Sequence, residues 1–253
     1  MSRIKIIIAT HKQYKFPNDE LYSPIQVGAL ISSVKLNMLR DDVHYNISSK
    51  NNSFCELTAL YWVWRNEVFK NVDYFGLVHY RRYFYGVSIK LKNKTIASKE
   101  ELLSILNSYD CILPKKRNYF IESVYNHYKH AHYSQDLDKS RDIIMQYYPE
   151  YLDAFDRVMN GKTLYLYNMF VMRTEILEDY CDWLFNILFR LEKEIDLSNY
   201  DQYQKRVFGF IAERLFNVWI LKNNINFKEL KVVNIEGDNL LSRALKFLKR
   251  KFL

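Results

Sequence analysis

The stretch Tyr74–Gly86, YFGLVHYRRYFYG, decides the fold that we predict for this chain. Its first residues, Tyr74–Val78, are apolar or small, with the aromatic and β-branched character of a covered strand. Two arginines and a histidine follow at once within His79–Arg82, and we expect the chain to turn at Gly86. Ligands of open α/β sheets bind beyond the carboxyl ends of strands. This strand end is therefore a candidate binding site.

The residue types in this strand end suit an anionic ligand. Arginine stays charged, and its planar fork binds two phosphate oxygens at once. Arg81 and Arg82 are adjacent, so only one of them needs to face a site unless the backbone turns there. The alternative is a surface ion pair beside packed tyrosines.

Outward from this stretch, strand-like and helix-like segments alternate along the chain. This alternation predicts one α/β domain with a mixed, partly parallel sheet flanked by helices. We expect strands at residues 3–12, 110–116, 163–173 and 227–235, and helices at residues 53–69, 98–109, 119–147, 175–195 and 203–224. Capping boxes are expected where Ser53 precedes Glu56 and where Ser98 precedes Glu101.

Composition excludes several classes of protein. Hydrophobic residues make up 49% of the 253 residues, which excludes a disordered chain. Six glycines and four prolines are too few for an all-β sandwich. The three cysteines form no CxxC pair, so neither a disulfide framework nor a zinc site is indicated. The sequence shows no signal peptide and no run of 18 apolar residues, and we expect a cytoplasmic protein.

The net charge of +8 invites a nucleic-acid or membrane partner, but the charge is uneven. From Leu240 onward the chain carries five Lys/Arg residues and no acid. Apolar residues recur there at helical spacing, so we predict a basic amphipathic tail at residues 237–253 that binds an anionic membrane surface. The alternative is that its apolar side packs on the domain.

Polar residues also gather at two other places where a ligand can bind. The first strand ends in Thr10, His11 and Lys12. Amide, hydroxyl and ammonium groups precede the helix that contains Glu56, at Asn46, Ser48, Lys50, Asn51 and Asn52. A helix N-terminus offers donors to an anion or a sugar hydroxyl. An ordinary capped loop is the alternative.

The segment 119–147 contains a histidine cluster. On one helix, His127 could meet His130, and His132 could meet Asp136, because residues three or four apart share a face. Such a His–Asp pair is either a metal pair or an acid/base pair. No further ligand with metal-site spacing is evident.

The helix expected at 203–224 carries a carboxylate among apolar residues. Arg206, Phe210 and Glu213 lie along one face, with Arg214 beside them. A glutamate is costly to bury unless it is paired or used. Catalysis by Glu213 and a structural Glu–Arg pair are both open at this point.

Several familiar motifs are absent. The sequence contains no GxxxxGK[ST], GxGxxG, GxSxG or HExxH. No strand ends in the Asp-x-Asp with which many nucleotide-sugar enzymes hold a divalent metal. The one match to that spelling, DLD at residues 136–138, lies in a helical context.

Taken in order, these stretches resemble a known family. IIIATHK, NISSKNNSFCELTALYWVWRN, YFGLVHYRRYF, YDCILPKK, YNMFVM and RVFGFIAERLFNVWI are similar to bacterial glycosyltransferases of capsule and O-antigen loci, long described as a domain of unknown function. The resemblance runs from about residue 4 to 222, and the combination of CELTALYW, HYRRYF and AERL is specific. It implies a GT-A-like (Rossmann-like) domain over residues 1–236.

The resemblance implies transfer of a sugar, galactose or galactofuranose in some relatives, from a nucleotide-diphosphosugar, with UDP as the expected nucleotide. The acceptor would be a hydroxyl of a growing, lipid-linked surface polysaccharide at the inner face of the cytoplasmic membrane. Where the metal-binding Asp-x-Asp usually stands, this sequence has HYRR. We therefore expect no metal site, with Mn²⁺ or Mg²⁺ recruited elsewhere as the alternative.

Position and resemblance together assign roles to individual residues. The catalytic base is expected to be Glu213, with Asp136 second and His130 third. The acceptor is expected at Asn168, His127 and Arg206. The donor is expected at Thr10, His11, Lys12, Lys50, Asn51, Glu56, His79, Tyr80, Arg81, Arg82 and Lys115.

Two other functions compete with the transferase. Tyrosine richness and basic charge would suit a nucleic-acid-binding module, but such a module should carry its charge along a groove rather than in a tail. We therefore predict no nucleic-acid partner. A nucleotide-sugar hydrolase on the same fold is the rival among enzymes.

Overall fold

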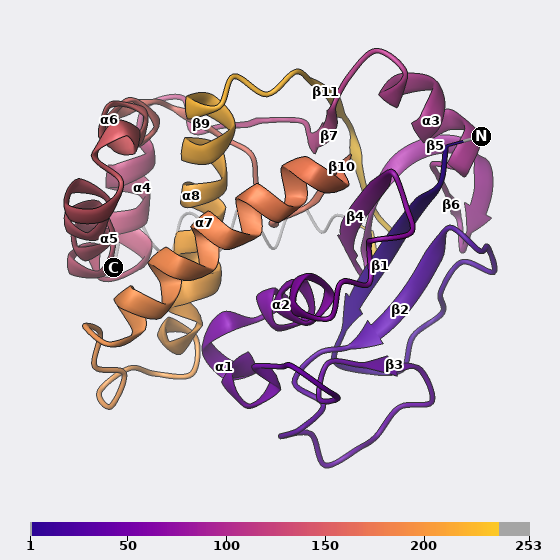
Figure 1. Cartoon of the computed structure of the whole chain (residues 1–253), viewed down its shortest axis with the longest axis horizontal. Helices are drawn as coiled ribbons and strands as arrows, with labels where there is room; N and C mark the ends of the chain where they lie inside the picture. Colours follow the sequence, from indigo (N-terminus) through magenta and orange to yellow (C-terminus); the bar gives the residue numbers. More distant parts are fainter. Residues whose placement is uncertain (1, 238–253) are drawn as a thin grey trace.

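The computed structural model describes residues 2–237, which form a mixed β-sheet covered by helices (Figure 1). The strand order is β11-β7-β10-β4-β1-β2-β3. Strand β4 pairs in parallel with β1, as β1 does with β2, whereas β10 runs antiparallel to both of its neighbours. The strands are β1 (Ile4–Thr10), β2 (Tyr22–Gln26), β3 (Leu39–Arg40), β4 (Tyr74–His79), β7 (Cys111–Pro114), β10 (Phe170–Arg173) and β11 (Phe227–Leu230).

Helices cover one face of this sheet. Figure 1 shows α4, α5 and α6 gathered on the side away from β1–β3, with α7 and α8 between them and the strands. None of the described helices is both long and apolar enough to cross a membrane. The helices are α1 (Asn51–Phe54), α2 (Leu57–Arg65), α3 (Lys99–Leu106), α4 (Val124–Ala131), α5 (Ser134–Tyr147), α6 (Leu152–Asn160), α7 (Thr174–Glu192) and α8 (Val207–Lys222).

The other face is covered by α3 and by strands that extend the sheet. Strand β5 (Arg82–Leu91) pairs with β6 (Lys94–Ile96) and with β12 (Val232–Asn234). Alternate residues of β1 point to opposite faces. Ile7 packs into the core beneath the helices, and Ile6 packs into the core shared with β5 and α3. Strands β8 (Arg117–Asn118) and β9 (Thr163–Leu164) form a small separate sheet.

The predicted α/β class with a mixed, partly parallel sheet is confirmed. The prediction of a turn at Gly86 is wrong, because the chain reverses at Tyr80–Arg81 and Gly86 lies inside β5. A side chain at Gly86 would meet the backbone Cα of Ala97 at 2.3 Å. The glycine therefore permits a close approach between segments rather than a turn.

The helix expected at 53–69 is broken. Helix α1 ends at Phe54, and α2 begins at Leu57. Between them Cys55 has φ of +54°, outside the helical region. The expected capping box at Ser53 is wrong, since Ser53 lies inside α1 and its hydroxyl bonds to the carbonyl of Lys50. The capping box of Ser98 with Glu101 is confirmed.

Three other expected elements are also divided. The segment 119–147 becomes α4 and α5, and His132 caps the end of α4. His132 and Asp136 therefore do not share one helix face. The strand expected at 163–173 splits into β9 and β10, and that expected at 227–235 splits into β11 and β12. Residues 238–253 of the predicted tail lie outside the described residues.

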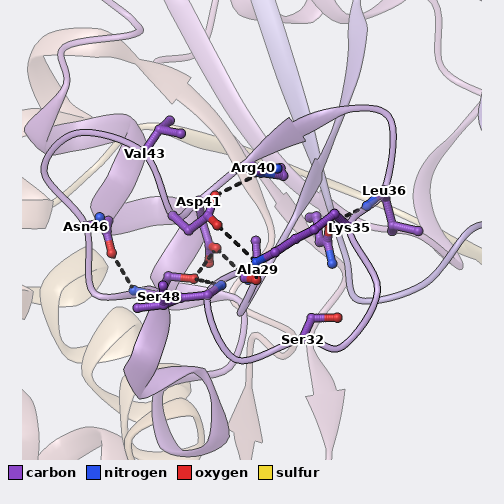
Figure 2. A network of polar contacts seen from close by, with 12 residues as sticks. Ala29, Ser32, Lys35, Leu36, Arg40, Asp41, Val43, Asn46 and Ser48 are labelled. Carbon is purple, nitrogen blue, oxygen red and sulfur yellow. Dashed lines mark hydrogen bonds and ion pairs between the residues drawn. The ribbon is translucent and has the colours of Figure 1, made fainter.

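A buried carboxylate organises the loops between β2 and α2. The side chain of Asp41 accepts hydrogen bonds from the backbone N–H of Gly28 (2.8 Å) and of Ala29 (3.0 Å). The hydroxyls of Ser48 (2.5 Å) and Thr58 (2.6 Å) also donate to it. Figure 2 shows Asp41 between Ala29 and Ser48. The loop after β2 and the start of α2 are thereby held together.

Replacing Asp41 by alanine should lower the free energy of unfolding by about 3 kcal/mol or more, because several buried donors lose their acceptor. Chemical denaturation measures this. Asp153→Ala is the control: Asp153 pairs with Arg157 at 3.7 Å, and the two side chains are 84% and 66% exposed. Such a pair contributes about 1 kcal/mol or less. Equal losses in the two variants would contradict the assignment.

Candidate active site

An open cleft of about 840 Å³ lies at the carboxyl ends of β1 and β4. Segments distant in the sequence form its walls: the two strand ends, helix α1, the loop before β10, and the start of α8. The lining residues are Ala9, Thr10, His11, Val27, Asn51, Asn52, Cys55, Glu56, His79, Tyr80, Arg81, Arg82, Tyr167, Gln202, Lys205, Arg206 and Glu213.

The end of β4 supplies a histidine fixed by a backbone carbonyl. Nε2 of His79 lies 2.6 Å from the carbonyl oxygen of Tyr167. A carbonyl only accepts, so Nε2 carries the proton and donates. Burial lowers the pKa of His79, and the charges of Arg82 and Arg81 lower it further, although Glu56 and the carbonyl of Tyr167 oppose them. His79 is therefore neutral near pH 7.

The two adjacent arginines both line the cleft. The chain reverses at Tyr80–Arg81 between β4 and β5, so the two arginines do not alternate along one straight strand. Arg81 lies 5.6 Å from the ring of Tyr80 and pairs with Glu236 at 3.4 Å. The guanidinium of Arg82 lies 4.4 Å above the ring of Tyr167. Both arginines therefore contribute positive charge to the same cleft.

The end of β1 adds aromatic and cationic groups to the same rim. The rings of His11 and Tyr80 meet edge to face, with centroids 5.4 Å apart. Nζ of Lys12 lies 4.9 Å from the Tyr80 ring centroid. Burial lowers the pKa of His11, as do the charges of Lys12 and Arg81. This side of the cleft is therefore electropositive even with its histidines neutral.

Carboxylates face these cations from the helices. Oε1 of Glu213 accepts the backbone N–H of Tyr167 at 2.7 Å, and Oε2 pairs with Arg214 at 3.1 Å. Burial raises the pKa of Glu213 and Glu56 adds to the rise, whereas Arg214 and the N–H of Tyr167 oppose it. Oε1 of Glu56 accepts from the amide of Asn168 at 2.7 Å. Two carboxylates thus share the cleft.

Tyr167 connects the two halves of this site. Its N–H bonds Glu213 and its carbonyl bonds His79, while its ring lies under Arg82. Tyr167 and Asn168 are consecutive residues with positive φ, +78° and +49°. Strained backbone of this kind persists only where surrounding bonds hold it. The loop before β10 is therefore a rigid brace for the acid and the histidine.

The N-terminal end of α8 adds a second cationic group, Arg206, to the cleft. Nε of Arg206 lies 3.3 Å from the sulfur of Cys55. Burial raises the pKa of Cys55 to about 11, so the thiol is protonated near neutral pH. The amide of Asn51 donates to the carbonyl of Cys55 at 2.7 Å. The broken helix at residues 51–57 is thus pinned against α8.

The structure brings together most of the residues that the sequence singled out. Those that line the cleft are Thr10, His11, Asn51, Glu56, His79, Tyr80, Arg81, Arg82, Arg206 and Glu213. Lys12 lies next to the cleft, with its Nζ over the ring of Tyr80. Asn168 is buried, and its side-chain amide donates to Glu56 and to the carbonyl of Gly209.

Other predicted residues lie outside the cleft lining. Lys50 pairs with Glu192, and Lys115 is exposed beyond β7. The carboxylate of Asp136 is buried and accepts from the hydroxyl of Tyr200 at 2.7 Å. His130 is exposed and lies 3.4 Å from Glu122. The ring of His127 stacks on Tyr119 at 4.0 Å.

Sequence reasoning missed several residues of the site. Lys205, Gln202 and Cys55 line the cleft, as does Tyr167. Lys205 precedes Arg206 at the start of α8, so its charge was a readable signal. The role of Tyr167 could not be predicted from the sequence, because it depends on backbone hydrogen bonds to residues far away in the chain.

The donor set at the end of β4 does not suit Mg²⁺ or Mn²⁺, which prefer oxygen ligands. The guanidinium groups of Arg81 and Arg82 and the Nε2–H of His79 occupy that place. Across residues 2–237, no group of three or more His, Cys, Asp or Glu side chains is placed to hold a metal ion.

Three comparisons relate this geometry to known proteins. The model of the domain of unknown function DUF4422 matches residues 5–224. A solved structure described as the apo form of the bifunctional glycosyltransferase WbbM is similar, with a TM-score of 0.84 and 33% identity. The match covers 93% of this chain and 46% of WbbM, so the chain spans less than half the length of that protein. No curated protein matches.

Proposed function

The chain belongs to the DUF4422 family, and from this premise we propose that it is a glycosyltransferase that uses a nucleotide-diphosphosugar donor. The predicted family and GT-A-like fold are confirmed by the family match and by the similarity to WbbM. One observation carries the proposed activity: a cleft at the carboxyl ends of parallel strands whose cationic rim faces two carboxylates.

The cationic rim suits the leaving group of such a reaction. When the sugar bond breaks, the nucleoside diphosphate gains negative charge, and preorganised donors in the cleft stabilise that charge. We assign this task to Arg81 and Arg82, with His11 and the strand end at Thr10 contacting the donor. Lys205 and Arg206 provide further positive charge on the opposite wall.

The carboxylates suit the other half of the reaction. Transfer to a hydroxyl requires a base that takes the hydroxyl proton. Glu213 lines the cleft and its pKa is raised by burial, which favours proton acceptance near neutral pH. Each of its oxygens has one partner and keeps a lone pair for an acceptor hydroxyl. We therefore assign the base to Glu213.

We further propose UDP as the nucleotide, and thermal denaturation with UDP-, GDP-, CMP- and dTDP-sugars tests the donor class. A ligand at about 100 times its dissociation constant stabilises the folded state by about 2.7 kcal/mol. The UDP-sugars should raise the melting temperature, and Arg82→Ala should remove the rise. If no nucleotide-sugar of the panel raises the melting temperature, the proposal is contradicted. Product analysis without acceptor separates a hydrolase from a transferase.

We expect transfer to continue in excess EDTA, because guanidinium groups replace a metal at the strand end. The measurement is turnover with the donor that stabilises the protein, before and after chelation, with Mn²⁺ and Mg²⁺ added back. A change smaller than about twofold is expected. Loss of turnover that only a divalent cation restores would show that charge stabilisation by arginine is insufficient.

The acceptor that we propose is a lipid-linked oligosaccharide of a surface polysaccharide, at the inner face of the cytoplasmic membrane. The basic residues from Leu240 onward support this placement, since each Lys or Arg near an anionic surface contributes on the order of 1 kcal/mol. Deleting residues 240–253 should weaken sedimentation with anionic vesicles and leave turnover on a soluble acceptor unchanged. Unchanged vesicle binding would contradict the role of the tail.

A further inference from the structure

The loop between β8 and α4 exposes two large apolar side chains side by side in the sequence. Phe120 is 75% exposed and Ile121 is 74% exposed, the highest values among the large hydrophobic residues that the structure describes. Scattered exposed apolar residues are ordinary, but an adjacent pair at a loop tip is a candidate contact surface.

This loop is held in shape rather than left loose. The N–H of Phe120 donates to Oδ1 of Asn118 at 2.7 Å, and the N–H of Ile121 donates to the carbonyl of Tyr119 at 2.7 Å. Phe120 has φ of +58°, a conformation that is strained for a bulky residue. The ring of Tyr119 stacks on His127 at the base of the loop. The fold therefore stabilises a conformation that exposes both apolar side chains.

The surroundings of this tip are basic. Lys115, Lys116 and Arg117 directly precede it and are all exposed. The N–H of Tyr119 donates to the carbonyl of Lys162, so a further exposed lysine lies across the small sheet. Between residues 115 and 123 the only acid is Glu122, which lies next to His130.

Helix α4 connects the base of the loop to the candidate active site: Tyr119 stacks on His127, and the ring of the next residue, Tyr128, lies 5.0 Å from the guanidinium of Arg214, which pairs with Glu213. Burial raises the pKa of Tyr119, and the charges of Arg214 and Glu213 also act on it. Tyr119 therefore lies within electrostatic reach of the proposed base, while the two residues that follow it are exposed to solvent.

We propose that Phe120 and Ile121 insert into the headgroup region of an anionic membrane. The basic residues that precede them in the chain, Lys115, Lys116 and Arg117, would then contact the lipid headgroups. The surface area of two apolar side chains is far smaller than the roughly 800 Å² that each partner buries in a stable protein interface. Apolar tips with adjacent basic residues are instead suited to the interface of an anionic bilayer. This inference rests on the proposed function only for its purpose, which is to bring a lipid-linked acceptor to the cleft.

Vesicle sedimentation of the full chain tests the contact without any donor or acceptor. Phe120→Ser/Ile121→Ser should weaken binding to phosphatidylglycerol-containing vesicles by about tenfold or more. The control Val34→Ser/Val87→Ser removes two other exposed apolar side chains, 59% and 68% exposed, and should bind as the unaltered chain does. Lys115→Gln/Lys116→Gln/Arg117→Gln should weaken binding and reduce its dependence on salt.

A second measurement locates the contact even where the tail dominates binding. Phe120→Trp should show a blue-shifted emission and strong quenching by vesicles whose phosphatidylglycerol carries brominated acyl chains, whereas Val87→Trp should not. Native tryptophans give a constant background, since Trp62, Trp183 and Trp219 are buried and Trp64 is partly buried against Phe185, and Val87→Trp carries the same background. Absence of quenching at position 120 in vesicle-bound protein would overturn the proposal.

Two further results would also overturn it: no binding of the unaltered chain to anionic vesicles, or loss of a dimer in Phe120→Ser/Ile121→Ser. The second would show that the tip contacts another copy of this chain. Because vesicle binding is measured without turnover, a failure here leaves the proposed transferase activity standing. An inactive protein that still inserts position 120 would contradict the activity alone.

Discussion

Glu213→Gln should reduce turnover by about 10²–10⁴-fold, the usual contribution of a general base. The glutamine keeps an oxygen that can accept the N–H of Tyr167, so the brace before β10 should survive. It cannot take a proton from an acceptor hydroxyl. Donor binding should stay within a few-fold of normal, and the loss should appear in kcat. Turnover, donor affinity and melting temperature are measured on the same preparation.

The ion pair with Arg214 complicates this variant and also makes it informative. The side chain of Arg214 is 4% exposed, and breaking such a pair costs about 3–5 kcal/mol of stability. If the role of Glu213 is only structural, Glu213→Gln should lower the melting temperature, and the protein that remains folded should keep normal turnover. Glu213→Asp keeps the charge and serves where the glutamine variant fails to fold. Partial turnover in Glu213→Asp would support the base.

The pH dependence gives an independent signature of the base. Burial raises the pKa of Glu213, and only the ionised form accepts a proton. Turnover should therefore fall as pH drops through a pKa above the ordinary value for glutamate. Any residual turnover of Glu213→Gln should lack this acid limb. An unchanged limb would identify another group, and Glu56→Gln is the first variant to compare.

The neighbouring candidates are distinguished by the same assay. Asp136 is buried against Tyr200, so an acceptor hydroxyl does not reach its carboxylate. His130 is exposed and lies outside the cleft lining. Asp136→Asn and His130→Gln should therefore keep turnover near that of the unaltered protein. A large loss in either variant would transfer the base to that residue.

The fold and the cationic edge were readable from the sequence because both depend on local pattern. The covered strand Tyr74–Val78 and its charged end are continuous in the chain, and parallel strands bring their carboxyl ends together. The helix with Glu213 was readable for the same reason, since an acid among apolar residues is conspicuous. Local signals therefore located the cleft.

What local pattern did not reveal depends on distant partners. Cys55 interrupts a helix that periodicity favours, because α1 packs on α8 through the sulfur and Gly209. Lys50 was expected at the donor but pairs with Glu192, which lies far along the chain. The four donors to Asp41 come from three separate segments: the turn at Gly28–Ala29, Ser48 before α1, and Thr58 in α2. Tertiary contacts decided each of these positions.

Arg82→Ala should lower kcat/KM by about 10²–10³-fold, the usual cost of removing one preorganised donor to developing charge. Arg82 is the stronger candidate of the two arginines because its guanidinium is stacked on Tyr167, which also braces Glu213 and His79. Arg81 also pairs with Glu236, and Arg81→Ala should cost less. Arg82→Lys keeps the charge without the fork and should recover part of the loss.

The control for these variants is Arg157→Ala, which removes a guanidinium that is 66% exposed and lies on α6 outside the catalytic cleft. It should leave kcat/KM and donor affinity unchanged. All variants should keep their fold, as judged by cooperative melting without ligand. If Arg81→Ala and Arg82→Ala both keep full activity, the diphosphate does not bind at the end of β4. The alternative cations are then Lys205 and Arg206 on the opposite wall, and the donor would lie reversed in the cleft.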